Sequence, residues 1–469
     1  MEKYLKLFEN HAQYEEYISG KGAIIPNVSH CIQEVEVHYK PKKDYAAMYL
    51  TFEILTDGTI EWNEYGGKRD YIAKTIYYSK DDGENWNVLD NSNSNVSIDV
   101  EEGEKVIFKG ENEWYGEISD YDYWNNFRGT AEFNLYGNIL SLFYGDDFKN
   151  YTELPEIHYA EEDNYEKHII FIFALSNVVS AENLILPTNT ASSCYYNMFA
   201  KCYKLMVAPK LPATTLSDYC YDGMFSDCTS LTTAPKLPAT TLAENCYGGM
   251  FAGCTNLTTA PKLLATTLAE SCYNSMFNGC TSLTVTPELP STTLAESCYN
   301  SMFSGCTSIS KAPELPATTL ANYCYYRMFE WCTSLTEAPE LRATELSDWC
   351  YAGMFYGCTS LTTAPELPAT TLKERCYSYM LARCTSLTTA PDLIATKLVS
   401  ECYLFMFEGS TNLNYIKAMF TTKPGSGYTS YWVDGVSSSG TFVKNSAATW
   451  NVRGRNGIPS GWTIETAIE

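Results

Sequence analysis

The chain has 469 residues, a hydrophobic content of 45% and a formal net charge of −24 at pH 7. This length is enough for about two or three globular units. The acidic balance argues against nucleic-acid binding, which requires a basic surface to displace counterions, and disfavours contact with an anionic membrane. We interpret the charge as a source of solubility in preference to a calcium-binding role.

The first residues carry no recognisable export signal. Residues 1–11 lack the apolar core of a signal peptide, and the longest aliphatic run, 169–175, is far shorter than the roughly 18 residues of a membrane span. We therefore expect synthesis in the cytoplasm and no membrane insertion. Residues 1–25 are predicted to form an amphipathic helix, either an anchor and subunit contact or a helix packed on the next domain.

Residues 26–150 are predicted to form an all-β sandwich domain. Short runs rich in Val, Ile, Tyr and Phe are bounded there by clusters of Gly, Asp, Asn and Lys. The runs are VEVHY, MYLTFEIL, TIEW, KTIYYS, VSIDV, KVIFKG and AEFNLYG. The segment 79–86 resembles an Asp-box hairpin, in which Asp81 bonds turn amides, Gly83 takes a positive φ and Trp86 packs below. A single such turn predicts a hairpin and does not indicate a sialidase.

Residues 113–127 interleave aromatic rings with acids and amides. The rings are Trp114, Tyr115, Tyr121, Tyr123 and Trp124, and the polar residues beside them include Asp120, Asp122, Asn125 and Asn126. Rings that stack on sugar faces next to groups that bond hydroxyls are what a carbohydrate site requires. A long loop that covers a sheet edge uses the same residue types, and we favour that structural interpretation.

Residues 151–193 form a linker and a degenerate first repeat, and residues 194–413 repeat with a strict period. A Cys-Tyr pair recurs every 26 residues, at Cys194, Cys220, Cys246, Cys272, Cys298, Cys324, Cys350, Cys376 and Cys402. A fixed period of this size is typical of a solenoid, in which each unit buries its apolar face against its neighbours. Residues 414–469 leave the period and are predicted to form a C-terminal cap of small strands.

One repeat shows which local structures to expect. Leu242, Cys246, Met250 and Cys254 fall four residues apart, as on one face of a short helix. Thr241 and Glu244 match a capping box at the start of that helix, and Gly253 suits a left-handed cap at its end. The following segment, 257–263, is predicted to begin as a brief strand and to continue as polyproline-like chain, because Pro261 removes an amide. The predicted fold class is an α/β solenoid of helix plus strand, preceded by the sandwich.

The repeat resembles a known family. Its pattern, Met-Phe-x-x-Cys-Thr-Ser-Leu-Thr-x-Ala-Pro-x-Leu-Pro-Ala-Thr-Thr-Leu, is similar to the BspA-like leucine-rich repeats of gut-bacterial surface proteins and of virion appendages of phages that infect those bacteria. The departures are Leu264, Arg342, Leu381, Ile394 and Ser410. The resemblance implies adhesion or recognition by the repeat surface, with no catalytic residues and no cofactor.

Seventeen of the eighteen cysteines fall in two repeat columns, and Cys31 lies outside them. A disulfide across the eight-residue spacing would exceed bridging distance on a helix, and the spacing is foreign to zinc knuckles. We interpret these cysteines as free, buried and small. The tyrosine that follows the first cysteine of each repeat is predicted to form a stacked structural ladder.

A candidate contact surface lies in the later repeats. The exposed side of the predicted helices carries Tyr326, Arg327, Trp331, Trp349, Tyr356 and Tyr379, where earlier repeats have small residues. Tyr, Trp and Arg are enriched at binding hot spots, so units around 320–380 are the predicted contact patch.

No motif indicates catalysis or a metal site. All five histidines precede the regular repeats, and no phosphate loop or nucleophile elbow occurs. The leading hypothesis is a non-catalytic virion appendage that binds a host-surface glycan or protein, or neighbouring virion subunits, with homo-oligomer formation left open. The alternatives are a bacterial cell-surface adhesin and a glycan-binding or glycan-degrading protein that uses residues 113–127.

Overall fold

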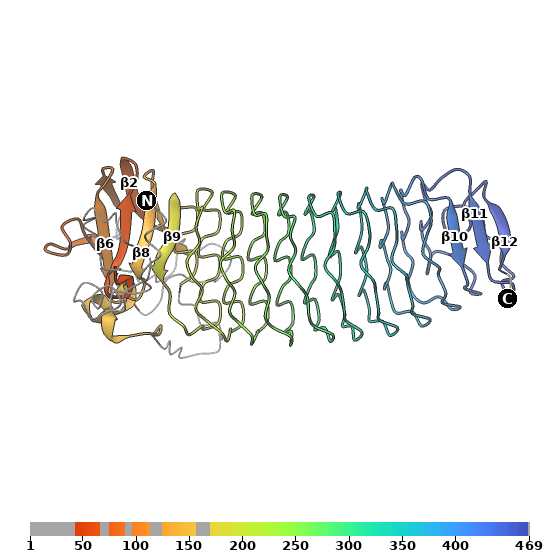
Figure 1. Cartoon of the computed structure of the whole chain (residues 1–469), viewed down its shortest axis with the longest axis horizontal. Coiled ribbons are helices and arrows are strands. Elements are labelled where there is room, and N and C mark those ends of the chain that lie inside the picture. Colours follow the sequence, from red (N-terminus) through yellow and green to blue (C-terminus); the bar gives the residue numbers. More distant parts are fainter. Residues whose placement is uncertain (1–42, 66–74, 90–95, 113–123, 156–168, 468–469) are drawn as a thin grey trace, which may run out of the picture. The chain divides into compact units, whose positions relative to one another are not determined.

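The computed structural model describes residues 43–65, 75–89, 96–112, 124–155 and 169–467. The chain divides into two compact units, Met1–Asp44 and Tyr45–Glu469. The predicted N-terminal helix, 1–25, falls outside the described residues. The second unit contains two β-sheets followed by a long series of coils, each one repeat in length (Figure 1).

The two sheets occupy residues 50–185. The larger sheet has the strand order β4-β3-β6-β1-β8-β9, and the smaller has the order β5-β2-β7. Their strands are β1 (Leu50–Ile54), β2 (Gly58–Tyr65), β3 (Ile76–Ser79), β4 (Asn87–Leu89), β5 (Val96–Val100), β6 (Lys105–Gly110), β7 (Trp124–Arg128), β8 (Phe133–Asn138) and β9 (Val178–Ile185). All neighbouring strands are antiparallel except β8 and β9, which pair in parallel.

Aromatic side chains join the sheets. The rings of Phe52 on β1 and Phe127 on β7 lie 4.9 Å apart, and both residues are fully buried. Three short helices accompany the sheets: η1 (Tyr45–Ala47), α2 (Ser141–Tyr144) and η2 (Gly145–Asn150). This arrangement is compatible with the predicted sandwich. Strands β4, β7 and β9 were not among the predicted runs, and β9 lies beyond the predicted domain boundary at residue 150. The run VEVHY, residues 35–39, lies outside the described part of the chain.

The Asp-box hairpin between β3 and β4 is confirmed. The Asp81 carboxylate accepts the Asn85 amide at 2.9 Å, and the Ser79 hydroxyl donates to it at 2.6 Å. Gly83 has a φ of 94°. The hydrogen bond from Ser79, with the two from Asn85, lowers the pKa of Asp81 to about 2. The turn is therefore fastened by a carboxylate that stays ionised.

The predicted α/β solenoid is wrong, because the coils contain no helix. Among the described residues only α2 is an α-helix. The segment 193–202, which we call the turn ribbon of its coil, is a succession of tight turns. Every fourth residue has a left-handed backbone, as at Ser193 (φ 57°), Asn197 (φ 51°) and Lys201 (φ 61°). A right-handed helix cannot contain such residues, so the four-residue spacing of apolar side chains reflects consecutive turns.

Backbone hydrogen bonds explain why the turn ribbon is stable without helical bonds. The Tyr195 amide donates to the Cys220 carbonyl of the next coil at 2.8 Å, whereas the Tyr196 amide donates within its own turn to Ser193 at 3.2 Å. The same alternation continues along the ribbon and recurs in later coils, as from Tyr325 to Cys350 at 3.1 Å. Successive amides of the turn ribbon thus donate alternately to a carbonyl of the next coil and to a carbonyl of their own turn, so these amides have hydrogen-bond partners.

The predicted helix ends are corrected in the same way. The Glu244 amide, which a capping box would bond to Thr241, donates to the Asp218 carboxylate of the preceding coil at 3.0 Å. Gly253, with a φ of 74°, occupies the third left-handed position of its turn ribbon and caps no helix.

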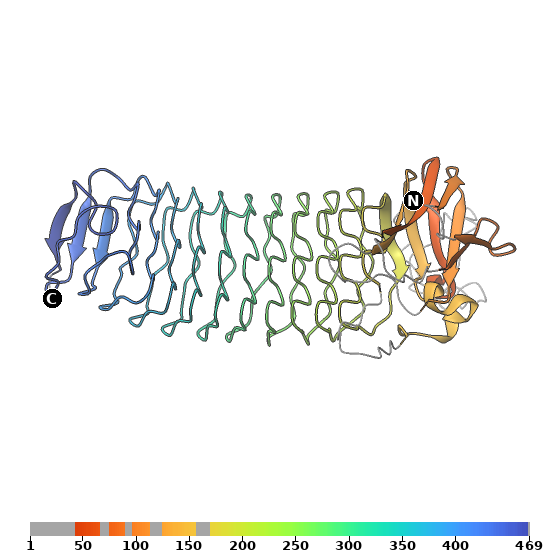
Figure 2. The same ribbon diagram turned by 180° about the vertical axis from the view of Figure 1, so that it is seen from behind.

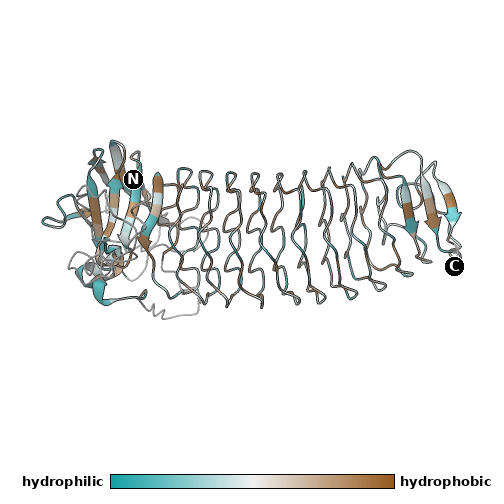
Figure 3. Cartoon of the chain, in the orientation of Figure 1, coloured by the Kyte–Doolittle hydropathy of each residue, from teal (hydrophilic) through white to brown (hydrophobic). Residues whose placement is uncertain are grey.

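Inward-facing columns form the core of the coils. The tyrosine ladder is confirmed: rings of successive coils stack from Tyr195 to Tyr403, with centroids 5.3 to 6.0 Å apart. A parallel column of phenylalanines stacks from Phe173 to Phe355. All these rings are buried. Figure 3 shows the hydrophobic and hydrophilic positions alternating around the coils and along the strands.

The interpretation of the repeat cysteines as free and buried is confirmed for all seventeen, while Cys31 lies outside the described residues. Thiols of the second column donate to a phenylalanine carbonyl of the preceding coil, as from Cys254 Sγ to Phe225 at 3.1 Å. Ser410 replaces the thiol in its coil, and its hydroxyl donates to Leu381 at 2.8 Å. Burial raises the pKa of Cys246 to about 12, so this thiol stays protonated at neutral pH.

Proline limits strand formation on the opposite side of each coil. There, neighbouring coils share only isolated bridges, such as Thr233 with Thr259 and Thr259 with Val285. A longer strand, β10 (Tyr415–Ala418), forms where Lys417 replaces the proline found at Pro391 one repeat earlier. The brief strand predicted for 257–263 is therefore reduced to a single bridged residue, Thr259, while the prediction that proline interrupts the ladder agrees with the structure.

Both ends of the solenoid are covered. At the first coil, the Phe173 ring lies 5.9 Å from Phe127 of β7 and 5.3 Å from Phe199, so the phenylalanine column begins in the core of the two sheets. At the other end, β10 pairs in parallel with β11 (Thr441–Lys444), which pairs with β12 (Thr463–Thr466). Figure 2 shows these strands after the last coils. The predicted small strands of the C-terminal part are present.

Tryptophans replace the tyrosine ladder at this C-terminal end. Trp432, Trp450 and Trp462 are buried, and each indole N–H donates to a backbone carbonyl. The Trp432 ring lies 6.3 Å from Tyr403, the last ring of the ladder. Larger rings thus fill the core at the last turn ribbon and beside the strands β10 to β12.

Candidate binding site

The outward surface of the turn ribbons changes along the solenoid. The third left-handed column is glycine in six coils, at Gly253, Gly279, Gly305, Gly357, Gly409 and Gly435, with φ between 70° and 74°. Trp331 occupies the same column with a φ of 58°, and 41% of its surface is exposed. A bulky residue at positive φ is unfavourable, and such residues concentrate at functional sites. The indole at position 331 is therefore the strongest signal on this surface.

Two glycines of the next coil make room for side chains that lie across them. A Cβ atom at Gly357 would lie 2.5 Å from Trp331 Cε3, and one at Gly353 would lie 2.9 Å from Arg327 Cγ. The Trp331 indole and the stem of Arg327 therefore occupy the space that side chains at these two glycines would fill. Both side chains thus pack against the next coil, Trp331 at Gly357 and Arg327 at Gly353.

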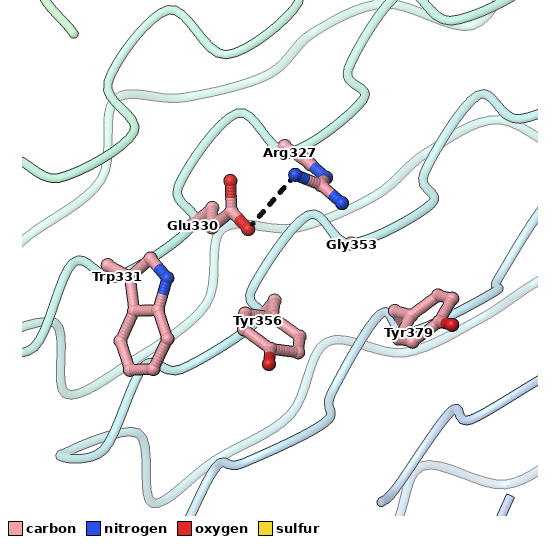
Figure 4. Close-up of a pocket in the computed structure, with 6 residues that line it drawn as sticks. All are labelled: Arg327, Glu330, Trp331, Gly353, Tyr356 and Tyr379. Atoms are coloured by element: carbon pink, nitrogen blue, oxygen red, sulfur yellow. Dashed lines mark ion pairs between the residues drawn. The ribbon is translucent and has the colours of Figure 1, made fainter. Parts of the chain in front are cut away.

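Six residues from three successive coils surround an open hollow of about 350 Å³ (Figure 4). They are Arg327, Glu330, Trp331, Gly353, Tyr356 and Tyr379, and we call this site the hollow. Four of the six residues predicted as a solenoid contact patch line it. The sequence-based prediction did not include Glu330 and Gly353.

The rings around the hollow do not stack on one another. Trp331 and Tyr356 meet edge to face, with centroids 5.3 Å apart and planes at 84°. Tyr356 and Tyr379 are 6.4 Å apart with planes at 64°. In the buried ladder, by contrast, neighbouring rings are nearly parallel. The rings of the hollow are thus not paired face to face with each other.

The charged groups of the hollow are paired. Arg327 Nη1 lies 3.5 Å from Glu330 Oε1, and the Ser304 hydroxyl donates to Glu330 Oε2 at 3.4 Å. Burial raises the pKa of Glu330, and the Arg327 guanidinium opposes that shift. The pair presents both donors and acceptors without adding net charge.

The other two predicted residues belong to the same surface. The Tyr326 and Trp349 rings lie 6.0 Å apart, and the Arg327 guanidinium lies 5.1 Å from the Tyr326 ring. Trp349 also stacks with Tyr323 at 5.5 Å and lies under Arg375 at 4.4 Å. We define the aromatic face as Tyr323, Tyr326, Arg327, Trp331, Trp349, Tyr356 and Tyr379.

Residues that the sequence reasoning missed have a recognisable signal. Tyr323 stands in the column of Asn245, Ser271 and Ser297, small polar residues of the three preceding coils, although an earlier coil has Tyr219 in this column. Comparing each outward column along the repeats therefore identifies Tyr323 as well as Trp331. Gly353 has no such signal, because its role depends on the direction of the Arg327 side chain.

The second predicted site falls mostly outside the described residues. Trp114, Tyr115, Tyr121 and Tyr123 lie there, as do Asp120 and Asp122. Trp124 begins β7, where it pairs with Tyr65 of β2, so the predicted loop ends before it. Asn126 is buried and its side-chain amide donates to the Ala174 carbonyl at 2.6 Å, which removes it from the proposed sugar site.

Comparison with known proteins finds no matching family model, no matching curated protein and no matching solved structure. Across the described residues, no group of three or more His, Cys, Asp and Glu side chains could hold a metal ion. No helix in this part of the chain has the length and hydrophobicity needed to cross a membrane.

Proposed function

We propose that the protein is a non-catalytic binding protein that uses the aromatic face of its solenoid as the contact surface. The observation that carries this proposal is Trp331, an exposed indole held at positive φ in a column that is otherwise mostly glycine. Burying exposed Trp, Tyr and Arg side chains supplies much of the binding energy at protein interfaces.

The scaffold beneath this face supports a binding role. Its coils are joined by regular backbone hydrogen bonds and by stacked rings, so the outward side chains start from a fixed backbone. Side chains that are held before the ligand arrives lose less entropy on binding. Among the described residues that line the hollow, Glu330 is the single carboxylate, and none is a His, Cys, Ser or Lys. The lining therefore favours binding over catalysis.

The setting we propose is a virion appendage that contacts a host surface or neighbouring virion subunits. Its support is the resemblance of the repeat to BspA-like leucine-rich repeats, which stays a prediction. A bacterial surface adhesin would use the same face. Detecting the chain in purified phage particles favours the first setting, and detecting it in a bacterial outer-membrane fraction favours the second.

Cell binding by the purified full chain tests the proposed function. The test variant replaces outward residues by those of earlier coils: Tyr326→Asn, Trp331→Gly, Trp349→Ser and Tyr379→Ser. We expect the parent chain to bind intact cells of one or more gut-bacterial strains and the variant to lose that binding. Val285→Thr is the control, because Val285 is exposed on the proline side and earlier coils have threonine there. Equal binding by parent and variant, or no binding to any strain, would refute contact between the aromatic face and a host surface.

A further inference from the structure

From the geometry of the hollow we infer the chemical class of its ligand: an uncharged sugar ring, as found at the end or along the chain of a neutral glycan. This inference rests on the proposed function and names what the aromatic face recognises. Sugar rings present apolar faces of C–H groups and a rim of hydroxyls. A site for them combines aromatic surface with side chains that both donate and accept hydrogen bonds.

The shape of the hollow suits a small ligand. Its volume of about 350 Å³ lies near the lower end of the roughly 300–1,000 Å³ found for small-molecule sites. Trp331 and Tyr356 stand nearly perpendicular, at 84°, so together they form two walls of a corner. Figure 4 shows Tyr356 between Trp331 and Tyr379, with Arg327 and Glu330 above this row. A sugar ring stacked on either Trp331 or Tyr356 would direct its hydroxyl rim toward the other side chain.

The charges argue against an anionic ligand. Three arginines lie near the hollow, and each already faces a carboxylate: Arg327 with Glu330, Arg375 with Glu401 and Arg383 with Glu408. An acidic sugar or a phosphate would have to compete with these partners for the guanidinium groups. A hydroxyl, which donates and accepts, can bond an arginine–carboxylate pair without breaking it.

The backbone argues against an extended peptide. Peptides that add a strand require unpaired amides and carbonyls at a sheet edge. Here the amides of Arg327, Trp331 and Gly353 donate to Ala352, Tyr356 and Ser378 of the following coils, at 2.9, 2.7 and 2.7 Å. The ribbon under the hollow therefore offers no free edge. Recognition must come from side chains, as in sugar binding.

A glycan array probed with the full chain, carrying neutral and acidic glycans, tests the inference. We expect binding to neutral glycans that persists as ionic strength rises, because no ion pair with the ligand is involved. Trp331→Gly should weaken the affinity for the best neutral glycan at least about tenfold, as expected for loss of an aromatic hot spot. Its melting temperature should stay close to that of the parent, because glycine occupies this column in six other coils. Val285→Thr should bind as the parent does.

Three results would overturn the ligand class: acidic glycans bound in a salt-sensitive way, no glycan bound at all, or neutral binding unchanged by Trp331→Gly. A peptide array run in parallel identifies a peptide ligand, which would also overturn it. These results leave the proposed function standing if the cell-binding variant still loses its binding. Failure of the cell-binding experiment refutes host-surface contact by the aromatic face together with the ligand class, so the two outcomes can be told apart.

Discussion

Single residues show where this chain departs from its own repeat. From Asn245 to Gly305 the left-handed positions hold Gly, Asn or Ser, whereas the coils that follow place Tyr323, Arg327, Trp331, Trp349 and Tyr379 there. Large residues also occupy such positions before this stretch and after it, at Phe171, Leu175, Tyr219, Phe405 and Tyr431. Each bulky residue at such a position costs of order 1 kcal/mol relative to glycine. The change from small to large residues between Gly305 and Tyr323 is more readily explained by binding at the later coils than by folding.

Asp222 is a residue whose charge opposes folding. Burial raises its pKa to about 7 from an ordinary 3.8, although the Asn245 side-chain amide donates to it. The folded state therefore keeps a proton that the unfolded state releases above pH 4. The contribution of Asp222 to the free energy of unfolding therefore falls as pH rises from about 4 to about 7 and then levels off.

Asp222→Asn should remove this loss because the amide carries no charge and its oxygen can still accept from Asn245. We expect the variant to be about 1–3 kcal/mol more stable than the parent at pH 8, with a much smaller difference at pH 4. Urea denaturation at the two pH values provides the measurement. A difference that does not grow with pH would show that Asp222 is ionised in the folded protein.

Substitutions of Ser410 measure how much the side-chain hydrogen bonds of the second cysteine column contribute to the free energy of unfolding. Its hydroxyl donates to the Leu381 carbonyl at 2.8 Å and accepts the Cys384 amide at 3.1 Å. Ser410→Ala should lower the free energy of unfolding by about 1–3 kcal/mol, because both buried partners lose a hydrogen bond. Ser410→Cys restores the residue of the other coils and should cost less. Equal losses in the two variants would mean that the side-chain hydrogen bonds contribute little.

At the scale of the element, the turn ribbon shows what the sequence can and cannot predict. A strict period places equivalent side chains in columns, so the buried tyrosines, the free cysteines and the position of the aromatic face can all be predicted. The local conformation cannot be derived from the spacing of Leu242, Cys246, Met250 and Cys254, because consecutive turns and a helix share a spacing of four. Gly253 is compatible with both. The perpendicular arrangement of Trp331 and Tyr356 depends on the directions of their side chains, which the spacing of residues in the sequence does not determine.

Gly279 and Gly357 have the same backbone conformation but different surroundings. Alanine substitutions at the two positions therefore separate the cost of positive φ from the cost of a clash with Trp331. Gly279 (φ 72°) has its nearest atoms 3.8 Å from an added Cβ, whereas Gly357 (φ 73°) would place it 2.5 Å from Trp331. Gly279→Ala should cost about 1 kcal/mol from positive φ alone, and Gly357→Ala should cost more and displace the indole.

Thermal unfolding and near-ultraviolet circular dichroism of the two alanine variants measure these effects. Gly357→Ala should also weaken any binding that depends on Trp331, whereas Gly279→Ala should leave it intact. Indistinguishable spectra and stabilities would mean that Trp331 does not lie over Gly357.

For the whole second unit, the two sheets act as the N-terminal cap of the solenoid. Phe173 is fully buried between Phe127 and Phe199, and β9 pairs with β8 on one side and bridges Val207 on the other through Ser180. The hydrophobic core is therefore continuous from the sheets into the coils. In a repeat array such a cap protects the first coil from solvent.

Phe173→Ala should uncouple the sheets from the coils. Deleting this buried ring should cost about 3–5 kcal/mol at the junction, so we expect the sheets and the coils to unfold in separate transitions. Hydrogen exchange during a thermal ramp measures the order in which segments open. Phe277→Ala, in the middle of the same column, is the matched control and should leave the sheets joined to the coils before it. A single transition in Phe173→Ala would show that the contact is not needed for cooperativity.

Amides of each coil donate to carbonyls of the next coil in the same pattern along the solenoid. The number of coils can therefore change without altering the contacts of those that remain. Removing one period, for example 246–271, leaves every remaining coil facing the same kind of neighbour, and both caps keep their partners. Such a deletion would shift the aromatic face one coil toward the sheets without altering it. Gain or loss of tandem gene segments could thus set how far this face lies from the two sheets, independently of what it recognises.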